Sequence, residues 1–175
     1  MTDKSALRAR MRAARLAFPP VAIHPSPEFL ARLKPGSAVA SYRPMPGEAD
    51  PALLERAAIA AGCALALPWL ADRAAPMCFR WWDGVLDRGP FGIEQPPADA
   101  AEVVPDVILT PLVAFDRAGG RLGQGAGFYD RAFKMSPGAW RVGVAWSVQE
   151  AASIPTDPWD VPLHAIVTEK EWITP

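Results

Sequence analysis

Residues 109–131 read LTPLVAFDRAGGRLGQGAGFYDR and hold the pattern that decides the fold. An apolar, strand-like run ends in a polar turn, and three glycines then alternate within residues 123–127, close after Arg121. A helix is predicted to begin at Tyr129. Glycine permits positive φ and close backbone approach, and a helix N-terminus carries partial positive charge. This order of strand, glycine-rich loop and helix is typical of α/β proteins and favours a loop that binds phosphate oxygens.

The glycine loop, residues 123–127, is not one of the standard phosphate-binding fingerprints. It reads G-x-G-x-G rather than G-x-G-x-x-G, and no Gly-Lys-Ser/Thr follows it, so the generic nucleotide-fold assignments do not apply. A glycine-rich stretch is also typical of an ordinary turn. Phosphate binding is favoured here because charged and hydrogen-bonding side chains flank the loop on both sides, at Arg121, Tyr129, Asp130 and Arg131.

Further helices and strands are predicted outward from this stretch. Helices are expected over residues 3–16, with Thr2 or Asp3 as the cap, and over residues 51–61. The proline-rich segment 18–27 is expected to be an extended connector. Strands bounded by Pro, Gly or Asp are expected over residues 37–42, 64–67, 77–82, 107–112, 142–146 and 165–167.

Strands that alternate with helices predict a single domain over residues 1–175. Its fold class is α/β, with three α/β/α layers, a mostly parallel sheet and a Rossmann-like arrangement. A length of 175 residues with 50% hydrophobic content is enough for one core. Glu48 and the glycine loop are then expected just beyond strand carboxyl ends, where open α/β sheets bind ligands.

Composition and charge argue against several classes of function. With 18 basic and 19 acidic residues the formal net charge is −1, which gives no overall footprint for nucleic acid. The histidines lie far from Cys63 and Cys78 in sequence, so a zinc site is not expected; a disulfide between the two cysteines is the less favoured alternative to reduced thiols. Residues 4–15 are arginine-rich, as in a transit peptide, but Asp3 argues against that interpretation.

The chain has no long apolar run, which argues against a membrane-spanning segment. We expect a monomeric, cytoplasmic protein that binds neither nucleic acid nor membranes.

The residues around the glycine loop closely resemble the signature of the 5-formyltetrahydrofolate cyclo-ligase family. The resemblance covers nearly the whole chain, and residues 50–90 are its least diagnostic part. The matching positions are Lys4, Arg8, Tyr42, Gly47, Glu48, Phe91, Gly92, Ile93, Pro96, Phe115, Asp116, Gly120 to Gly123, Gly125, Gly127, Tyr129 to Arg131 and Trp159 to Leu163.

The resemblance implies an enzyme that converts 5-formyltetrahydrofolate to 5,10-methenyltetrahydrofolate with ATP and Mg²⁺, releasing ADP and phosphate. The formyl oxygen would attack the γ-phosphorus of ATP, and nitrogen 10 of the folate would then capture the activated carbon as phosphate leaves. Phosphoryl transfer depends on positioning and charge neutralisation more than on a protein nucleophile. The sequence accordingly shows no convincing Ser/His/Asp or Cys/His pattern.

The resemblance also implies the residues of the nucleotide site. Asp130 is expected to hold Mg²⁺, although an acid in the first turn of a helix is equally explained by the helix dipole. Arg121, Tyr129 and Asp130 are the expected catalytic residues. Expected to bind ATP are Lys4, Arg8, Arg121, Leu122, Gly123, Gln124, Gly125, Ala126, Gly127, Phe128 and Tyr129.

The basic side chains of the helix predicted over residues 3–16 have two interpretations. A solvated basic face would be the usual interpretation of such a stripe. The resemblance instead implies that Lys4 and Arg8, one turn apart, close over the nucleotide. It implies nothing for Arg10, Arg12 and Arg15, which are expected to be surface or packing residues.

On the folate side, the resemblance implies that Glu48 accepts two N–H bonds from the pterin. Without the resemblance, Glu48 would be read as a capping or exposed acid. Arg43 is the expected basic contact of the substrate, and Tyr42, Phe91 and Tyr129 are the expected aromatic walls.

Two positions depart from the family pattern. His164 stands where several relatives have aspartate, which leaves a second magnesium contact open between Asp160 and His164. Ala126 replaces a lysine or glycine of some relatives.

The main alternative function is that of a catalytically silent relative that binds a nucleotide or phosphosugar. An RNA-binding module is less favoured, because the chain has no RNP-type aromatic pattern.

Overall fold

The central strands β11, β10, β7, β1 and β2 run parallel in one eight-stranded sheet. The computed structural model describes residues 3–175. The strand order is β12-β11-β10-β7-β1-β2-β3-β6, and the outer strands β12, β3 and β6 are antiparallel to their neighbours. The strands are β1 (Ala38–Ala40), β2 (Ala64–Trp69), β3 (Cys78–Trp81), β6 (Glu102–Val103), β7 (Val107–Pro111), β10 (Trp140–Val144), β11 (Ala165–Val167) and β12 (Trp172–Ile173).

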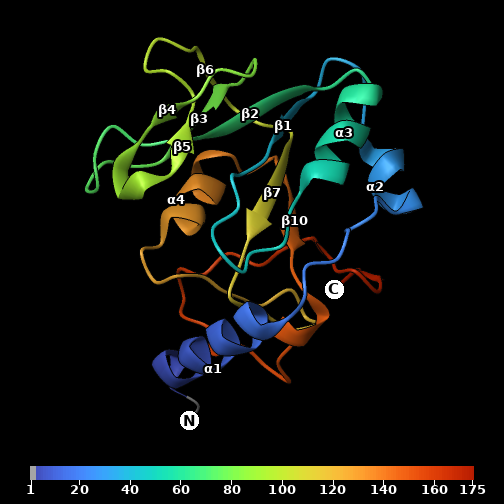
Figure 1. The fold of residues 1–175 in the computed structure, drawn as a ribbon. Helices are drawn as coiled ribbons and strands as arrows, with labels where there is room; N and C mark the ends of the chain where they lie inside the picture. The colour runs from blue at the N-terminus through green and yellow to red at the C-terminus, as the bar shows by residue number, and fades with distance from the viewer. Residues whose placement is uncertain (1–2) are drawn as a thin grey trace.

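Helices cover both faces of the sheet, which confirms the expected α/β fold with a mostly parallel sheet (Figure 1). Helices α2 (Pro27–Arg32) and α3 (Ala52–Ala60) pack on one face, through Phe29 and Leu54. Helix α4 (Phe128–Met135) packs on the other through Phe133. Helix α1 (Lys4–Ala17) covers neither face and lies beyond the carboxyl ends of the central strands (Figure 1).

The central strands are apolar on both sides because both of their faces are buried. Along β7, Val107 and Leu109 join the core under α2 and α3, whereas Ile108 between them joins the core under α4. This alternation gives the near-continuous apolar runs typical of parallel strands covered on both faces. Leu109 is fully buried, so truncation to alanine should cost about 2–5 kcal/mol of stability.

Helix α1 begins and packs as its sequence predicts. The Asp3 side chain accepts a hydrogen bond from the Ser5 amide at 2.9 Å, and Leu7 and Met11 are buried one turn apart. Of the two expected caps, Asp3 is therefore the N-cap, and Thr2 lies outside the described residues. These apolar side chains pack against the turn after β7, including Val113, so α1 is held over the end of the sheet.

Some elements differ from the sequence-based expectations. The connector 18–27 is extended, but its last proline starts α2, capped by Ser26, which accepts from the Phe29 amide. The strand expected over 142–146 ends at Val144, because Ala145 and Trp146 turn away into a short 3-10 helix, η2 (Ser147–Gln149). Small elements that were not expected are the edge strands β6 and β12, together with β4 (Asp87–Arg88), η1 (Pro90–Gly92), β5 (Glu94–Gln95), β8 (Ala114–Phe115) and β9 (Arg121–Leu122).

Two further expectations concern covalent structure and the membrane. Cys63 and Cys78 are free thiols, so the disulfide alternative is wrong for this structure. Within residues 3–175, helices long and apolar enough to cross a lipid bilayer are absent.

Candidate active site

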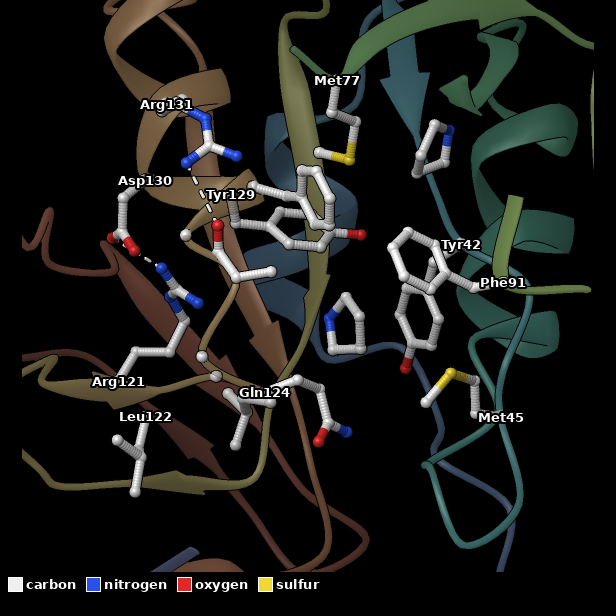
Figure 2. A pocket seen from close by; sticks show the side chains of 18 of the residues that line it. Tyr42, Met45, Met77, Phe91, Arg121, Leu122, Gln124, Tyr129, Asp130 and Arg131 are labelled. Atoms are coloured by element: carbon white, nitrogen blue, oxygen red, sulfur yellow. Dashed lines mark hydrogen bonds and ion pairs between the residues drawn. The ribbon is translucent and has the colours of Figure 1, made fainter. Parts of the chain in front are cut away.

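A cavity of about 890 Å³ opens beyond the carboxyl ends of the central strands. The strand order reverses here: the chain runs from β1 outward to β2 on one side of this point, and from β7 outward to β10 on the other side. Open α/β sheets bind ligands at such a reversal. The glycine loop and α4 form one wall, and the segments around Tyr42 and Phe91 form the opposite wall (Figure 2). Apart from His164, all of the residues expected from the sequence to bind ATP, folate or magnesium line this one cavity.

The glycine loop presents backbone rather than side chains to solvent and to the cavity. Residues 124–126 are exposed, and Gly125 and Gly127 have φ of 110° and 68°, which favour glycine. Gly127 is the N-cap of α4, which begins at Phe128, one residue before the expected start. The loop and the amino end of α4 therefore place amide groups and a partial positive charge at the cavity, the arrangement that binds anions.

The hairpin of β8 and β9 aims Arg121 at the cavity. Asp116 is buried in its turn and accepts hydrogen bonds from the Gly120 amide at 2.8 Å and the Ile154 amide at 2.7 Å. A Cβ atom on Gly120 would lie 2.6 Å from an Asp116 oxygen, so the turn requires glycine there. The geometry of this turn therefore determines where the Arg121 side chain starts.

Arg121 and Asp130 form an ion pair in the wall of the cavity (Figure 2). Arg121 Nη2 donates to Asp130 Oδ1 at 2.6 Å, and the arginine side chain is only 5% exposed. Among residues 3–175, Arg121 Nε has no hydrogen-bond partner although it is buried. A buried, unsatisfied donor is unfavourable, so this edge of the guanidinium is suited to an anionic ligand.

The cations of α1 reach the same cavity from its open side. Lys4 Nζ contacts Asp157 Oδ2 at 2.6 Å and Asp160 Oδ2 at 2.9 Å, and Arg8 Nε donates to the Gly123 carbonyl at 2.9 Å. Burial lowers the pKa of Lys4, but the two carboxylates outweigh it and leave that pKa above its ordinary value. Burial raises the pKa of Asp160, but the Asp157 amide and Lys4 outweigh it and lower that pKa. A purely solvated basic face is therefore wrong for Lys4 and Arg8.

One residue of this wall, Asp157, was missed in the sequence. Arg12 is exposed, as expected of a surface residue, and its Nη2 contacts Gln124 Oε1 at 2.6 Å, so it also ties α1 to the glycine loop. The spacing of Lys4, Arg8 and Arg12 at successive turns of one helix was the available signal. Asp157 gave no signal, because its role comes from Lys4, which is distant in sequence.

Glu48 is buried on the opposite side of the cavity. Its Oε2 accepts from the Met45 amide at 3.0 Å, its Oε1 lies 3.5 Å from Arg15 Nη1, and its side chain is 7% exposed. The interpretation of Glu48 as a capping or exposed acid is therefore wrong. It is Asp50 that accepts from the Ala52 amide at the start of α3.

The aromatic residues that were expected to contact folate all line the cavity, Tyr42 and Phe91 on one wall and Tyr129 on the wall of α4 (Figure 2). Tyr42 is buried and its hydroxyl donates to the Ala49 carbonyl. Burial, with the charge of Glu48, raises the pKa of both Tyr42 and Tyr129, so both phenols stay protonated at neutral pH. Phe91 is about half exposed, at 49%, and its φ of 61° is unusual for a residue with a side chain.

Arg43 lines the cavity, but much of its charge is already matched. Its Nη2 donates to Glu55, which also accepts from Ser41, and its guanidinium lies 4.5 Å from the centre of the Trp82 ring. Arg43 is therefore a fixed cation in the lining of the cavity rather than a free one.

His164 does not lie at the expected magnesium position. Its Nδ1 accepts from the Arg141 amide at 3.1 Å, its Nε2 lies 2.7 Å from Arg141 Nη2, and it is outside the cavity. Burial, with the charges of Arg141 and Arg32, lowers the pKa of His164. Of the two candidates for a second magnesium contact, only Asp160 lines the cavity.

The residues present fit magnesium only together with a phosphate ligand. Within residues 3–175, no group of three His, Cys, Asp or Glu side chains forms a complete metal site. Asp130 and Asp160 supply hard carboxylate oxygens beside the anion-binding loop. Mg²⁺ commonly binds through one or two carboxylates, substrate phosphates and water, so this donor set suits a metal that arrives with a nucleotide.

Comparisons with known proteins identify the family of this chain. The profile of the 5-formyltetrahydrofolate cyclo-ligase family matches residues 1–169. The 5-formyltetrahydrofolate cyclo-ligase of Mycolicibacterium smegmatis is 34% identical over 148 residues, covering 79% of this chain and 76% of that protein. The Haemophilus influenzae protein of the same name is 41% identical over 91 residues, 49% of each chain, so the chain spans about half the length of that relative.

Solved structures of methenyltetrahydrofolate synthetases have the same fold as this chain. The 5,10-methenyltetrahydrofolate synthetase of Aquifex aeolicus has a TM-score of 0.78 and 32% identity, covering 98% of this chain and 92% of that one. The enzyme of that name from Mycoplasma pneumoniae, at 23% identity, has a TM-score of 0.68 and shows the same fold. The family match spans the loop, the cavity walls and α1 together. The chain therefore belongs to the 5-formyltetrahydrofolate cyclo-ligase family.

Proposed function

We propose that the protein converts 5-formyltetrahydrofolate to 5,10-methenyltetrahydrofolate, using ATP and Mg²⁺ and releasing ADP and phosphate. The observation that carries this proposal is the single cavity, which joins an anion-binding loop to an aromatic wall with a buried carboxylate. A triphosphate and a planar pterin need these two environments next to each other, because the reacting atoms come from both ligands. Family membership supports the same reaction.

ATP binds along the glycine loop in this proposal. Backbone amides of residues 123–127 and the amino end of α4 bind phosphate oxygens, and Arg121 contributes its unsatisfied Nε–H. Lys4 and Arg8 approach from α1 and exchange their present partners for phosphate. Ion pairs that are partly exposed are weak enough for such an exchange.

The folate binds on the opposite wall. Glu48 accepts two N–H bonds from the amino and ring-nitrogen edge of the pterin, a bidentate pairing that gives orientation as well as affinity. Tyr42, Phe91 and Tyr129 supply flat apolar surface around the ring. The formyl group then faces the phosphate side of the cavity.

The reaction requires positioning and charge neutralisation. The formyl oxygen attacks the γ-phosphorus of ATP, the bond from that phosphorus to the β-bridging oxygen breaks, and ADP leaves. Nitrogen 10 then bonds to the activated formyl carbon and loses its proton to the departing phosphate, and the former formyl oxygen leaves within that inorganic phosphate. Arg121 neutralises charge on the transferring phosphoryl group, and Tyr129, held protonated, donates a hydrogen bond at the meeting point of the two ligands.

Asp130 is the residue that would hold the metal. Bound Mg²⁺ supplies neutralisation of the triphosphate charge. Asp130 is already placed by Arg121 and by the Val161 amide, 3.3 Å from its Oδ1, and Asp160 lies in the same cavity as an outer partner.

The test is a spectrophotometric assay of methenyltetrahydrofolate formation from 5-formyltetrahydrofolate. We expect product only when both ATP and Mg²⁺ are present, with one ADP and one phosphate released per product. A non-hydrolysable ATP analogue should bind and give no product. Tight binding of nucleotide without turnover under these conditions would contradict the proposal and favour a catalytically silent binding module.

A further inference from the structure

Arg15 is a buried cation whose role the proposed reaction leaves open. It lies in the last turn of α1, the helix that carries Lys4 and Arg8, and it is only 5% exposed. Charged residues are rarely this buried unless they are paired. The sequence-based expectation of a surface or packing residue is therefore incomplete, since something in the interior must match this charge.

The partner of Arg15 is Glu48. Arg15 Nη1 lies 3.5 Å from Glu48 Oε1, and the two side chains are 6% and 7% exposed. The same nitrogen donates to the Leu112 carbonyl at 3.0 Å, at the end of β7. Because Glu48 Oε2 accepts from the Met45 amide, each carboxylate oxygen has its own partner and the plane of the carboxylate is held from two sides.

A further set of hydrogen bonds holds the groups around Arg15 in place, beginning with the carbonyl that accepts from it. Gln149 Nε2 donates to the same Leu112 carbonyl at 2.7 Å, and Gln149 Oε1 accepts from the Trp146 amide at 2.8 Å. The Trp146 indole then donates to the Gly47 carbonyl, next to Glu48, at 3.0 Å. The network closes on itself and joins α1, β7, η2 and the segment that bears Glu48.

We propose that Arg15 is a positioning residue for the folate, acting through Glu48. It supplies the buried positive charge that faces the Glu48 carboxylate and fixes the orientation of that carboxylate toward the cavity. At 3.5 Å the pairing with Arg15 is loose, so Glu48 keeps capacity to accept N–H bonds from a pterin. This inference rests on the proposed function and adds a residue to its folate site.

The same contact links the two halves of the site. Helix α1 touches the glycine loop through Arg8 and Arg12 and touches the folate side through Arg15. Because α1 packs against the glycine loop, it also places the positive charge of Arg15 beside Glu48 on the folate side. Removing Arg15 leaves a buried carboxylate without its charge partner, which is strongly unfavourable.

The experiment compares Arg15→Met and Arg15→Lys with the wild-type protein, with Arg10→Met as the matched control at an exposed position of the same helix. Calorimetry measures the Kd of 5-formyltetrahydrofolate and of a non-hydrolysable ATP analogue. We expect Arg15→Met to weaken folate binding by about 30-fold or more. ATP-analogue binding should change by less than about 3-fold, Arg15→Lys should recover part of the folate affinity, and Arg10→Met should match the wild type.

A double-mutant cycle separates positioning from general stability. If Arg15 acts through Glu48, adding Arg15→Met to Glu48→Gln should change folate affinity by less than about 3-fold, because the interaction is already lost. Additive effects, equal weakening of both ligands, or unchanged folate affinity in Arg15→Met would overturn the proposal. Should Arg15→Met fail to fold, the same double-mutant cycle is measured with Arg15→Lys in its place.

Failure of the proposed function would look different. Wild-type protein that binds no 5-formyltetrahydrofolate would overturn the assigned reaction. The link between Arg15 and Glu48 would still be measured without ligand, by thermal unfolding of the four proteins of the cycle. A coupling in Tm without a coupling in folate affinity would show a purely structural ion pair and overturn the positioning role.

Discussion

The two walls of the cavity are built on different principles. The wall proposed to bind the nucleotide, called the nucleotide wall, uses consecutive residues of an exposed loop, and the partly exposed pair Lys4–Asp160 beside it holds charge that a ligand can rearrange. The folate wall uses buried groups from distant segments, among them Glu48 with Arg15. The first wall therefore depends on backbone conformation and on exchangeable charge, whereas the second depends on a preformed geometry that burial holds in place.

The largest effect is expected on the nucleotide wall. Arg121→Ala removes the cation that neutralises the transferring phosphate, so kcat should fall by about 1000-fold. Circular dichroism should show a retained fold, because the change lies in the wall of the cavity rather than under the sheet. Arg117→Ala is the matched control, since Arg117 lies in the same hairpin but pairs with Glu150 and Glu171 on the surface. Near-normal turnover in Arg121→Ala would remove this residue from the reaction.

The folate wall should respond to a single buried substitution. Glu48→Gln replaces a charged acceptor with an amide that presents a mismatched donor, so folate affinity should fall by about 100-fold. ATP affinity should change little. Calorimetric titration of each ligand decides this, with Asp50→Asn as the control, because the asparagine oxygen still accepts from the Ala52 amide. Equal losses for both ligands would show that the walls are not independent.

Backbone conformation can be tested at Gly125. Its φ of 110° is unfavourable for any residue with a side chain, while a Cβ atom there would lie 3.8 Å from Arg8, an ordinary contact. Gly125→Ala should therefore distort the loop without a clash and weaken ATP-analogue binding by about 10-fold, with folate affinity kept. Gly138→Ala, at a position with open space around it, should change neither affinity. Unchanged ATP affinity in Gly125→Ala would argue against backbone recognition of phosphate.

The smallest effect is expected at the exchangeable pair of Lys4 and Asp160. Asp160→Asn should lower the free energy of unfolding by about 1 kcal/mol at pH 7. The folded-state pKa of Asp160 is below its ordinary value of 3.8, so its contribution is present above that pH and is lost as the pH falls through the folded-state pKa. Urea unfolding between pH 7 and pH 3 measures this against Asp99→Asn, an exposed control. A difference that grows on acidification would contradict the assignment.

Local patterns predicted much of the fold. The run Val107–Pro111 was recognisable as a strand because it is apolar on both faces, and α1 was recognisable from its cap and its 3.6-residue period. The short helix α2 was missed because it directly follows the proline-rich connector 18–27, although Ser26 followed by Pro27 is a helix start signal. Hairpin strands of two residues, such as Arg121–Leu122, are too short to have a period at all.

The sequence by itself determined the chemistry of the nucleotide wall, because Arg121, the glycines and Asp130 lie within ten residues and local backbone preferences bring them together. Only the tertiary structure decided the charge partners. The pairing of Arg15 with Glu48, the contact of Lys4 with Asp157 and the exclusion of His164 from the cavity all join or separate segments far apart in the chain. No periodicity encodes such contacts, since they depend on how α1 crosses the end of the sheet.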